Sequence, residues 1–167
     1  MKKTLIVLVL TIMSISVNGS QSMFKALFMF NFAKYIEWPN MEQQSEFVIG
    51  VLGNDEIIPE LNKLAGARKI NNKKIVVKSV KTPAEGNGVH IFYVPNTKSN
   101  QIQKVVANFK GSPTLIVTDK PSLCKVGSHI NYVTVDGKMK FEVNKQNIIN
   151  HNLNVDPKLV ALGISVQ

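Results

Sequence analysis

The sequence predicts an α/β protein: a single three-layer domain with a mixed, largely parallel sheet flanked by helices and a C-terminal antiparallel hairpin. Two observations support this fold class. Short apolar runs alternate with segments of helical periodicity through the middle of the chain, which is typical of parallel strands joined by helices. The last third instead contains two strand-like runs around Asp136-Gly137, a dipeptide that favours a two-residue hairpin turn.

Residues 1–20 have the layout of a secretory signal peptide and are not expected to belong to the domain. Lys2 and Lys3 provide a basic start, and the apolar run that follows is shorter than the ~20 residues that span a bilayer. Small residues end the segment, and cleavage is expected near Gly19 or Ser20. Residues 21–167 should therefore form one exported domain, large enough to fold without disulfides or a structural metal.

The first helix of the domain is expected over FKALFMFNFAKYIEWP, residues 24–39, which holds half of the aromatic residues of the chain. Its main apolar stripe consists of Phe24, Phe28, Phe32 and either Tyr35 or Ile36. A narrow polar face, formed by Asn31, Lys34 and Glu37, argues against a membrane span. The apolar arc is wider than the ~100° of a helix resting on one core. Two interpretations stay open: a generous core, or surplus aromatic surface for a partner or a dimer.

Strands and helices then follow along the middle of the chain. Apolar runs predict strands at residues 46–53, 74–80, 89–94 and 114–119. Helical periodicity predicts helices at residues 55–66 and 102–109. Asp55 is the expected cap of the first of these helices, and Gly66 is its expected stop.

The hairpin joins residues 129–135 to residues 138–143, and its turn sets the register of the two strands. The expected opposite pairs are Ile130 with Val143, Asn131 with Glu142, and Tyr132 with Phe141. Two short helices close the chain. The second begins at Asp156-Pro157, because a capping residue followed by proline is typical of a helix start.

The net charge of +9 does not indicate a nucleic-acid partner. The lysines are scattered and Arg68 is the only arginine, although arginine supplies the bidentate contacts to phosphates and guanine edges. We interpret the charge as a solvated lysine surface. The single cysteine, Cys124, cannot form an internal disulfide, and we interpret it as a packed, unreactive residue rather than a reactive thiol.

No motif for catalysis, nucleotide binding or metal binding is present, so neither a cofactor nor a metal is expected. The three histidines lie in different predicted elements, and His90 is expected to be a core or edge residue with satisfied nitrogens. Asp55 and Asp119 follow strands, and ligands of open α/β sheets bind beyond the carboxyl ends of strands. A helix cap and a turn also explain these two residues, but a small ligand near Asp119 stays an alternative.

Five segments occur in a recognisable order and spacing: FKALFMFNFAKYIEWP, FVIGVLGND, VHIFYVP, PTLIVTD and INYVTVDGKMKFEVN. In these segments the chain resembles the YfiR-like periplasmic proteins, which include HmsC-like members. The resemblance implies a compact α/β domain, usually dimeric, that acts in the periplasm without catalysis. Members bind the periplasmic part of an inner-membrane diguanylate cyclase of the YfiN type and hold it inactive. Relief of this repression raises cyclic di-GMP and promotes biofilm formation, and related domains are attached to sensor histidine kinases.

Individual residues match the motifs of this family. The helix motif is matched by Asn31, Phe32, Lys34 and Trp38, and the later strand motifs by Asp119, Phe141, Glu142 and Asn144. The chain departs from the family at Val89, where members carry a cysteine before the residue equivalent to His90. Redox sensing through an internal disulfide, which is proposed for the family, is therefore not available to this chain.

The sequence thus predicts a non-enzymatic periplasmic regulator that docks on an inner-membrane sensor, either a diguanylate cyclase or a histidine kinase, and forms a homodimer. The alternative is a small-ligand-binding module that feeds a sensor kinase. The expected partner-binding residues are Phe24, Phe28, Asn31, Phe32, Lys34, Tyr35 and Trp38. The expected ligand-binding residues are Asp119, Glu142 and Asn144.

Overall fold

An eight-stranded sheet, in the order β10-β8-β7-β6-β5-β2-β4-β3, forms the centre of the computed structural model, which describes residues 17–167 and their side chains from residue 21. The expected signal peptide lies outside these described residues, except for the backbone of residues 17–20. The helices are α1 (Val17–Tyr35), α2 (Ile57–Ala67), α3 (Ile102–Asn108), α4 (Lys145–Asn150) and α5 (Pro157–Leu162).

The strands of this sheet are mostly parallel. They are β2 (Glu46–Leu52), β3 (Lys69–Ile70), β4 (Lys73–Val80), β5 (Ile91–Val94), β6 (Leu115–Thr118), β7 (Ile130–Val135), β8 (Lys138–Val143) and β10 (Ile164–Ser165). Only β3 with β4 and β7 with β8 pair antiparallel. A separate antiparallel sheet joins β1 (Ile36–Glu37) to β9 (Asn154–Val155).

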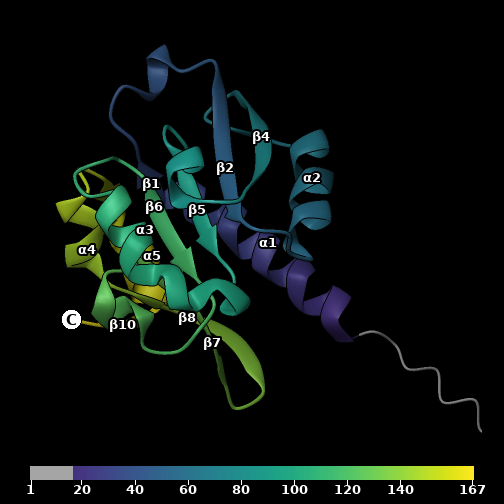
Figure 1. Ribbon diagram of the computed structural model, residues 1–167, viewed down its shortest axis with the longest axis vertical. Coiled ribbons are helices and arrows are strands. Elements are labelled where there is room, and N and C mark those ends of the chain that lie inside the picture. The colour runs from purple at the N-terminus through teal and green to yellow at the C-terminus, as the bar shows by residue number, and fades with distance from the viewer. Residues whose placement is uncertain (1–16) are drawn as a thin grey trace, which may run out of the picture.

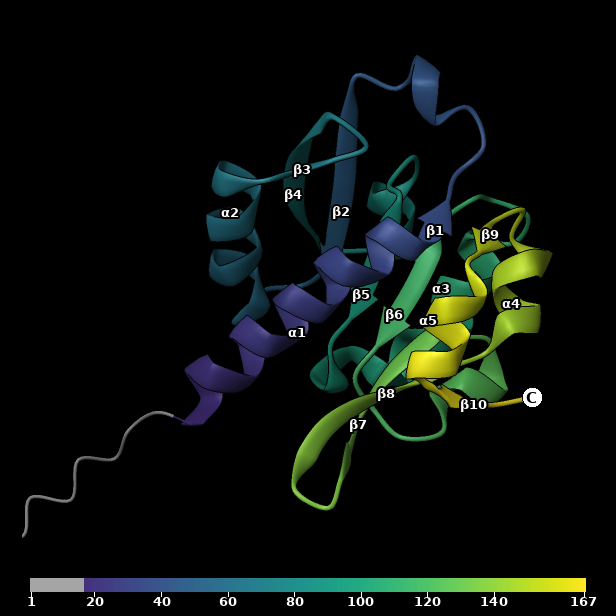
Figure 2. The ribbon, with the colours of Figure 1, turned by 180° about the vertical axis from the view of Figure 1, so that it is seen from behind.

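Helices cover both faces of the large sheet. Helix α3 lies on the face turned toward the viewer in Figure 1, where its apolar side chains pack with Phe92 and Ile116. Helices α1, α2 and α5 lie on the opposite face, as Figure 2 shows from behind. Their side chains join a larger core that includes Phe47, Tyr93 and Phe141. The predicted α/β class with a mixed, largely parallel sheet is therefore confirmed.

The hairpin has the predicted register: Ile130, Asn131 and Tyr132 pair with Val143, Glu142 and Phe141. Asp136 and Gly137 both have positive φ angles, 51° and 71°, as a two-residue turn of this type requires. Other predictions were wrong in detail. Helix α2 continues through Gly66 to Ala67, and the two-residue strands β1, β3, β9 and β10 were not predicted.

The sheet has two functionally different ends. The parallel strands β2, β5 and β6 all end on one side, which we call the carboxyl edge, and begin on the other, the amino edge. Helix α1 runs between the two ends. Lys25, near its start, contacts Asp119 at the carboxyl edge, whereas Trp38, just beyond its end, contacts His90 at the amino edge.

Candidate functional site

The structure divides the aromatic residues of α1 between the core and the surface. Phe32 is 1% exposed and Trp38 is 6% exposed, so both belong to the core. Phe24 is 46% exposed and the neighbouring Met23 is 41% exposed. The core interpretation therefore holds for Phe32 and Trp38, whereas the start of the helix leaves apolar surface exposed.

The buried part of the helix is fixed by aromatic contacts with the sheet. The ring of Phe32 lies 4.9 Å from that of Phe141 and 5.8 Å from that of Tyr132, between ring centroids. Trp38 packs edge-on against Phe47 at 5.0 Å, and its Nε1 donates to the carbonyl of His90 at 3.1 Å. Neither Phe32 nor Trp38 is therefore available to a partner on this surface.

Apart from Gln21 and Lys25, the exposed and partly exposed residues of α1 from residue 21 onward form one stripe, which we call the outer face of α1. It consists of Met23, Phe24, Leu27, Phe28, Asn31, Lys34 and Tyr35. The stripe is apolar toward the start of the helix and polar toward its end. The first turns extend past the ends of β2 and β4 (Figure 2), which explains why Phe24 is less covered than Phe32 on the same helix.

An ion pair ties the start of α1 to the carboxyl edge. The ammonium of Lys25 lies 2.6 Å from Oδ2 of Asp119, which directly follows β6. The hydroxyl of Tyr93 donates to the same oxygen at 3.3 Å. The hydroxyl of Tyr132 donates to the backbone carbonyl of Lys25 at 2.7 Å. Asp119 after β6 and Tyr132 of β7 thus contact one turn of α1 directly, and Tyr93 of β5 supports Asp119.

Both tyrosines remain protonated donors in this arrangement. Burial raises the pKa of Tyr93 far above its ordinary value, and the carboxylates of Asp119 and Asp55 raise it further. Burial, followed by the charge of Asp119, also raises the pKa of Tyr132. Neither hydroxyl is thus disposed to act as a base or a nucleophile at neutral pH.

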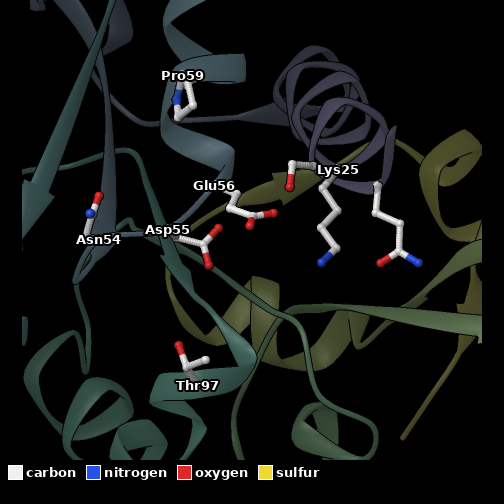
Figure 3. Close-up of a pocket in the computed structure, with 8 residues that line it drawn as sticks. Lys25, Asn54, Asp55, Glu56, Pro59 and Thr97 are labelled. Carbon is white, nitrogen blue, oxygen red and sulfur yellow. The ribbon is translucent and has the colours of Figure 1, made fainter. Parts of the chain in front are cut away.

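A cleft of about 560 Å³, which we call the carboxyl-edge cleft, lies between the start of α1 and the loop that follows β2 (Figure 3). Its lining includes Ser22, Lys25, Asn54, Asp55, Glu56 and Thr97. Asp55 also acts as the expected cap of α2, because its Oδ1 accepts a hydrogen bond from the backbone N–H of Ile57 at 3.0 Å. The cleft therefore offers two carboxylates, one ammonium group and neutral polar groups to a small polar molecule.

The three predicted ligand-binding residues do not share one pocket. Asp119 lines a smaller hollow beside Lys25 and Tyr132, of about 260 Å³. Glu142 accepts a hydrogen bond from the buried amide of Asn131 at 2.9 Å. Asn144 caps α4, because its side chain accepts from the N–H of Asn147. The structure brings Asp119 together with Lys25 instead, a residue 94 positions away that no local sequence pattern indicates.

Two histidines that no sequence pattern connects also lie together in the structure. The rings of His129 and His151 lie 4.3 Å apart, between centroids, in an edge-to-face arrangement. Cys124 is buried as expected, and burial raises the pKa of its thiol to about 12, which keeps it protonated and unreactive. Within the described residues, no three histidine, cysteine, aspartate or glutamate side chains are grouped to hold a metal ion.

Two observations concern the chain as a whole. No helix among residues 17–167 has the length and apolarity needed to cross a membrane. Comparison with protein families gives a match to a family model described as YfiR/HmsC-like, over residues 22–164. The match covers all strands of the large sheet, at least in part, together with the outer face of α1 and the carboxyl-edge cleft.

Proposed function

Because the chain belongs to the YfiR/HmsC-like family, we propose that it is a non-enzymatic periplasmic regulator of an inner-membrane diguanylate cyclase of the YfiN type. In this role it binds the periplasmic part of the cyclase and holds the enzyme inactive. Loss of binding then raises cyclic di-GMP and promotes biofilm formation.

The observation that carries this proposal is the outer face of α1. Phe24 is 46% exposed beside the exposed side chain of Met23, and Leu27 and Phe28 continue the apolar surface along the helix. Exposed aromatic side chains supply much of the binding energy in protein interfaces. Asn31 and Lys34 then provide the polar rim that such interfaces commonly have.

The outer face is presented on a rigid support. The ion pair between Lys25 and Asp119 and the hydrogen bond from Tyr132 to Lys25 both fix the turn of α1 that carries Phe24. Phe28 is held from below, because its ring lies 5.9 Å from that of Phe141. Since little ordering is required on binding, more of the contact energy is available as affinity.

The direct test measures binding of the mature domain to the periplasmic segment of the cyclase, by calorimetry or in membrane fractions. We expect the substitutions Met23→Ser and Phe24→Ser, made together, to weaken binding at least about tenfold. The matched control is Ile149→Ser on α4, because Ile149 is 45% exposed and therefore similarly accessible. The control should bind as the wild type does.

Two results would contradict the proposal. Unchanged affinity in the α1 variant, with its fold intact by circular dichroism, would show that the outer face is not the docking surface. A loss of binding in the Ile149→Ser control instead would place the docking surface at the other end of the molecule.

The carboxyl-edge cleft favours a second candidate function, a small-ligand-binding module that feeds a sensor kinase. Its opposed charges at Lys25, Asp55 and Glu56 suit a small zwitterion or a polar nucleotide fragment. A thermal-shift screen of amino acids and nucleotides tests this function, because a ligand at about 100 times its Kd stabilises the folded state by about 2.7 kcal/mol. A shift that Asp55→Asn abolishes would favour this candidate, and a blank screen would count against it.

We also propose that the protein forms the homodimer common in its family. The exposed apolar side chains of Leu162 and Ile164, beside the edge strand β10, support this proposal. Light scattering should give a dimer mass for the wild type and a monomer mass for Leu162→Asp. A dimer mass for both proteins would exclude this surface as the interface.

A further inference from the structure

Two histidines at the amino edge make the same pair of bonds to a neighbouring strand. His90, just before β5, donates its N–H to the carbonyl of Val48 at 2.9 Å, and its ring Nδ1 accepts from the N–H of Val48 at 3.0 Å. His129, just before β7, bonds Ile116 in the same two ways, both at 3.0 Å. In each case an imidazole nitrogen takes the place of a backbone carbonyl in the sheet.

This arrangement works only with neutral rings. A nitrogen that accepts a backbone N–H must offer a lone pair, so each ring is neutral and carries its hydrogen on Nε2. Protonation adds a hydrogen to Nδ1, where it faces the hydrogen of the strand N–H. The bond is then lost, and two donors point at each other in a buried place.

Among the described residues, no hydrogen bond or salt bridge joins the ring of His90 to a carboxylate, and no nearby charge contributes to its pKa shift. The side chains packed on it are the ring of Phe47 from β2, stacked at 4.7 Å, and Trp38 from the segment after β1, at 6.1 Å. Both are uncharged. Burial lowers the pKa of His90, and the hydrogen bond that Nδ1 accepts from the N–H of Val48 also favours the neutral ring.

The surroundings of His129 disfavour a charge still more. His129 is 0% exposed, and burial, followed by the neighbouring His151 at the end of α4, holds its pKa well below the ordinary value. The β6 residue that it bonds, Ile116, is apolar. Lys110, after α3, lines the same hollow as His151 and contributes a positive charge rather than a carboxylate.

The histidine pair is not arranged to hold a metal. Nε2 of His129 has no hydrogen-bond partner among the described residues, but it carries the hydrogen because Nδ1 accepts from Ile116. A metal ion would need the lone pair of Nε2 and could take it only by breaking the bond to Ile116.

We propose that His90 and His129 form an acid-sensitive latch at the amino edge, in which proton uptake breaks the bond from the N–H of Val48 to His90 and the bond from the N–H of Ile116 to His129, and so loosens the pairing of β5 with β2 and of β7 with β6. This inference goes beyond the proposed function and does not depend on it. It identifies the proton as an input that the chain itself senses.

Breaking these histidine bonds would also affect two segments that the backbone carbonyls of the histidines hold, the end of α1 and the start of α4. The carbonyl of His90 accepts from Nε1 of Trp38, which anchors the end of α1 to the sheet. The carbonyl of His129 accepts from the N–H of Asn144, the cap of α4. Loosening the amino edge therefore frees the end of the helix that carries the proposed partner surface, and the start of α4.

The sign of the pH effect follows from the lowered pKa values of the folded state. Above about pH 6.5 the rings are neutral in both states, and the stabilisation is complete. As the pH falls below that value, the unfolded chain takes up protons that the folded protein refuses. Each such histidine raises the equilibrium constant of unfolding about tenfold per pH unit, until the pH reaches its pKa in the folded state.

The test is urea unfolding between about pH 7.5 and about pH 5, above the range in which most carboxylates titrate. The substitutions His90→Asn and His129→Asn keep an acceptor oxygen near the position of Nδ1 but remove the titration. Each variant should take up one proton fewer on unfolding than the wild type. For each unit that the pH falls, the factor by which its equilibrium constant of unfolding rises should therefore be about ten times smaller. His151→Asn is the comparison for the strand bonds: burial also lowers the pKa of His151, so this variant too takes up fewer protons on unfolding, but its ring contacts the carbonyl of Ser112 and accepts no strand N–H. The amides of Val48 and Ile116 should therefore keep their wild-type protection from exchange in this variant.

Nuclear magnetic resonance of the wild type gives a second readout that needs no variant. The amide signals of Val48 and Ile116 should shift as the imidazoles titrate, and should lose protection from exchange before other core amides. The proposal is overturned if both rings titrate near pH 6.5 while these amides stay unchanged. It is also overturned if the two asparagine variants unfold with the pH dependence of the wild type.

Discussion

The two ends of the sheet accommodate polar side chains in opposite ways. At the carboxyl edge, polar side chains meet as ions beside an open cleft, with Lys25 paired to Asp119 and Asp55 close by. At the amino edge, polar groups are buried and neutral, with His90 and His129 bonded to strand N–H groups. The carboxyl edge tolerates charged side chains because water reaches them, whereas the bonds at the amino edge require that the two histidines are uncharged.

This difference predicts where a substitution costs the most stability. A partly exposed ion pair loses little when one partner is removed, because water replaces the contact. A buried polar group that loses its partner keeps the full cost of desolvation. Helix α1 crosses from one end to the other, so its own residues allow the contrast to be tested within a single element.

Trp38→Ala at the amino edge is expected to have the largest effect, a loss of about 3–5 kcal/mol in the free energy of unfolding. The substitution removes a buried ring that packs on Phe47 and leaves the His90 carbonyl without its indole donor. Urea denaturation at neutral pH measures the loss. A cost below about 1 kcal/mol would mean that the amino edge is not held by this side chain.

How much of this could be predicted from the sequence depends on the distance between the partners. The hairpin register was predicted correctly, because Asp136 and Gly137 fix the pairing of Tyr132 with Phe141 through a local turn. The strands β1 and β9 were missed, because each has only two residues and pairs across more than a hundred positions. A contact of that kind leaves no periodic pattern for sequence reasoning to detect.

The candidate site shows the same limit in a different form. The sequence identified the aromatic helix, but it placed Phe24 and Phe32 on one stripe and could not separate them. Their difference in exposure arises because the helix extends past the sheet at one end only. Asp119 was selected for its position after a strand, whereas Lys25, its partner, becomes evident only when α1 lies across the fold.

Asp119→Asn at the carboxyl edge is expected to have an intermediate effect, about 1–2 kcal/mol at low salt. The amide oxygen can still accept the hydroxyl of Tyr93, so the change removes the charge and little else. The difference from the wild type should shrink in high salt, because salt screens partly exposed pairs. A larger, salt-independent loss would show that this edge also depends on a buried polar group, and the contrast between the two ends would fail.

Phe24→Ser, at the exposed start of α1, is expected to have the smallest effect on stability, less than about 1 kcal/mol. Phe24 lies on the same helix as Phe32, yet nearly half of its surface is already in contact with water. Serine and phenylalanine also have similar helix propensities, so the backbone gives no reason for a larger loss. Thermal unfolding measures the change, and Phe32→Ser, which opens a cavity beside Phe141, is the informative comparison. If Phe24→Ser destabilised the protein as much as Phe32→Ser does, the ring of Phe24 would contribute to the stability of the fold. A small loss together with weakened binding to the cyclase would instead assign that ring to a partner.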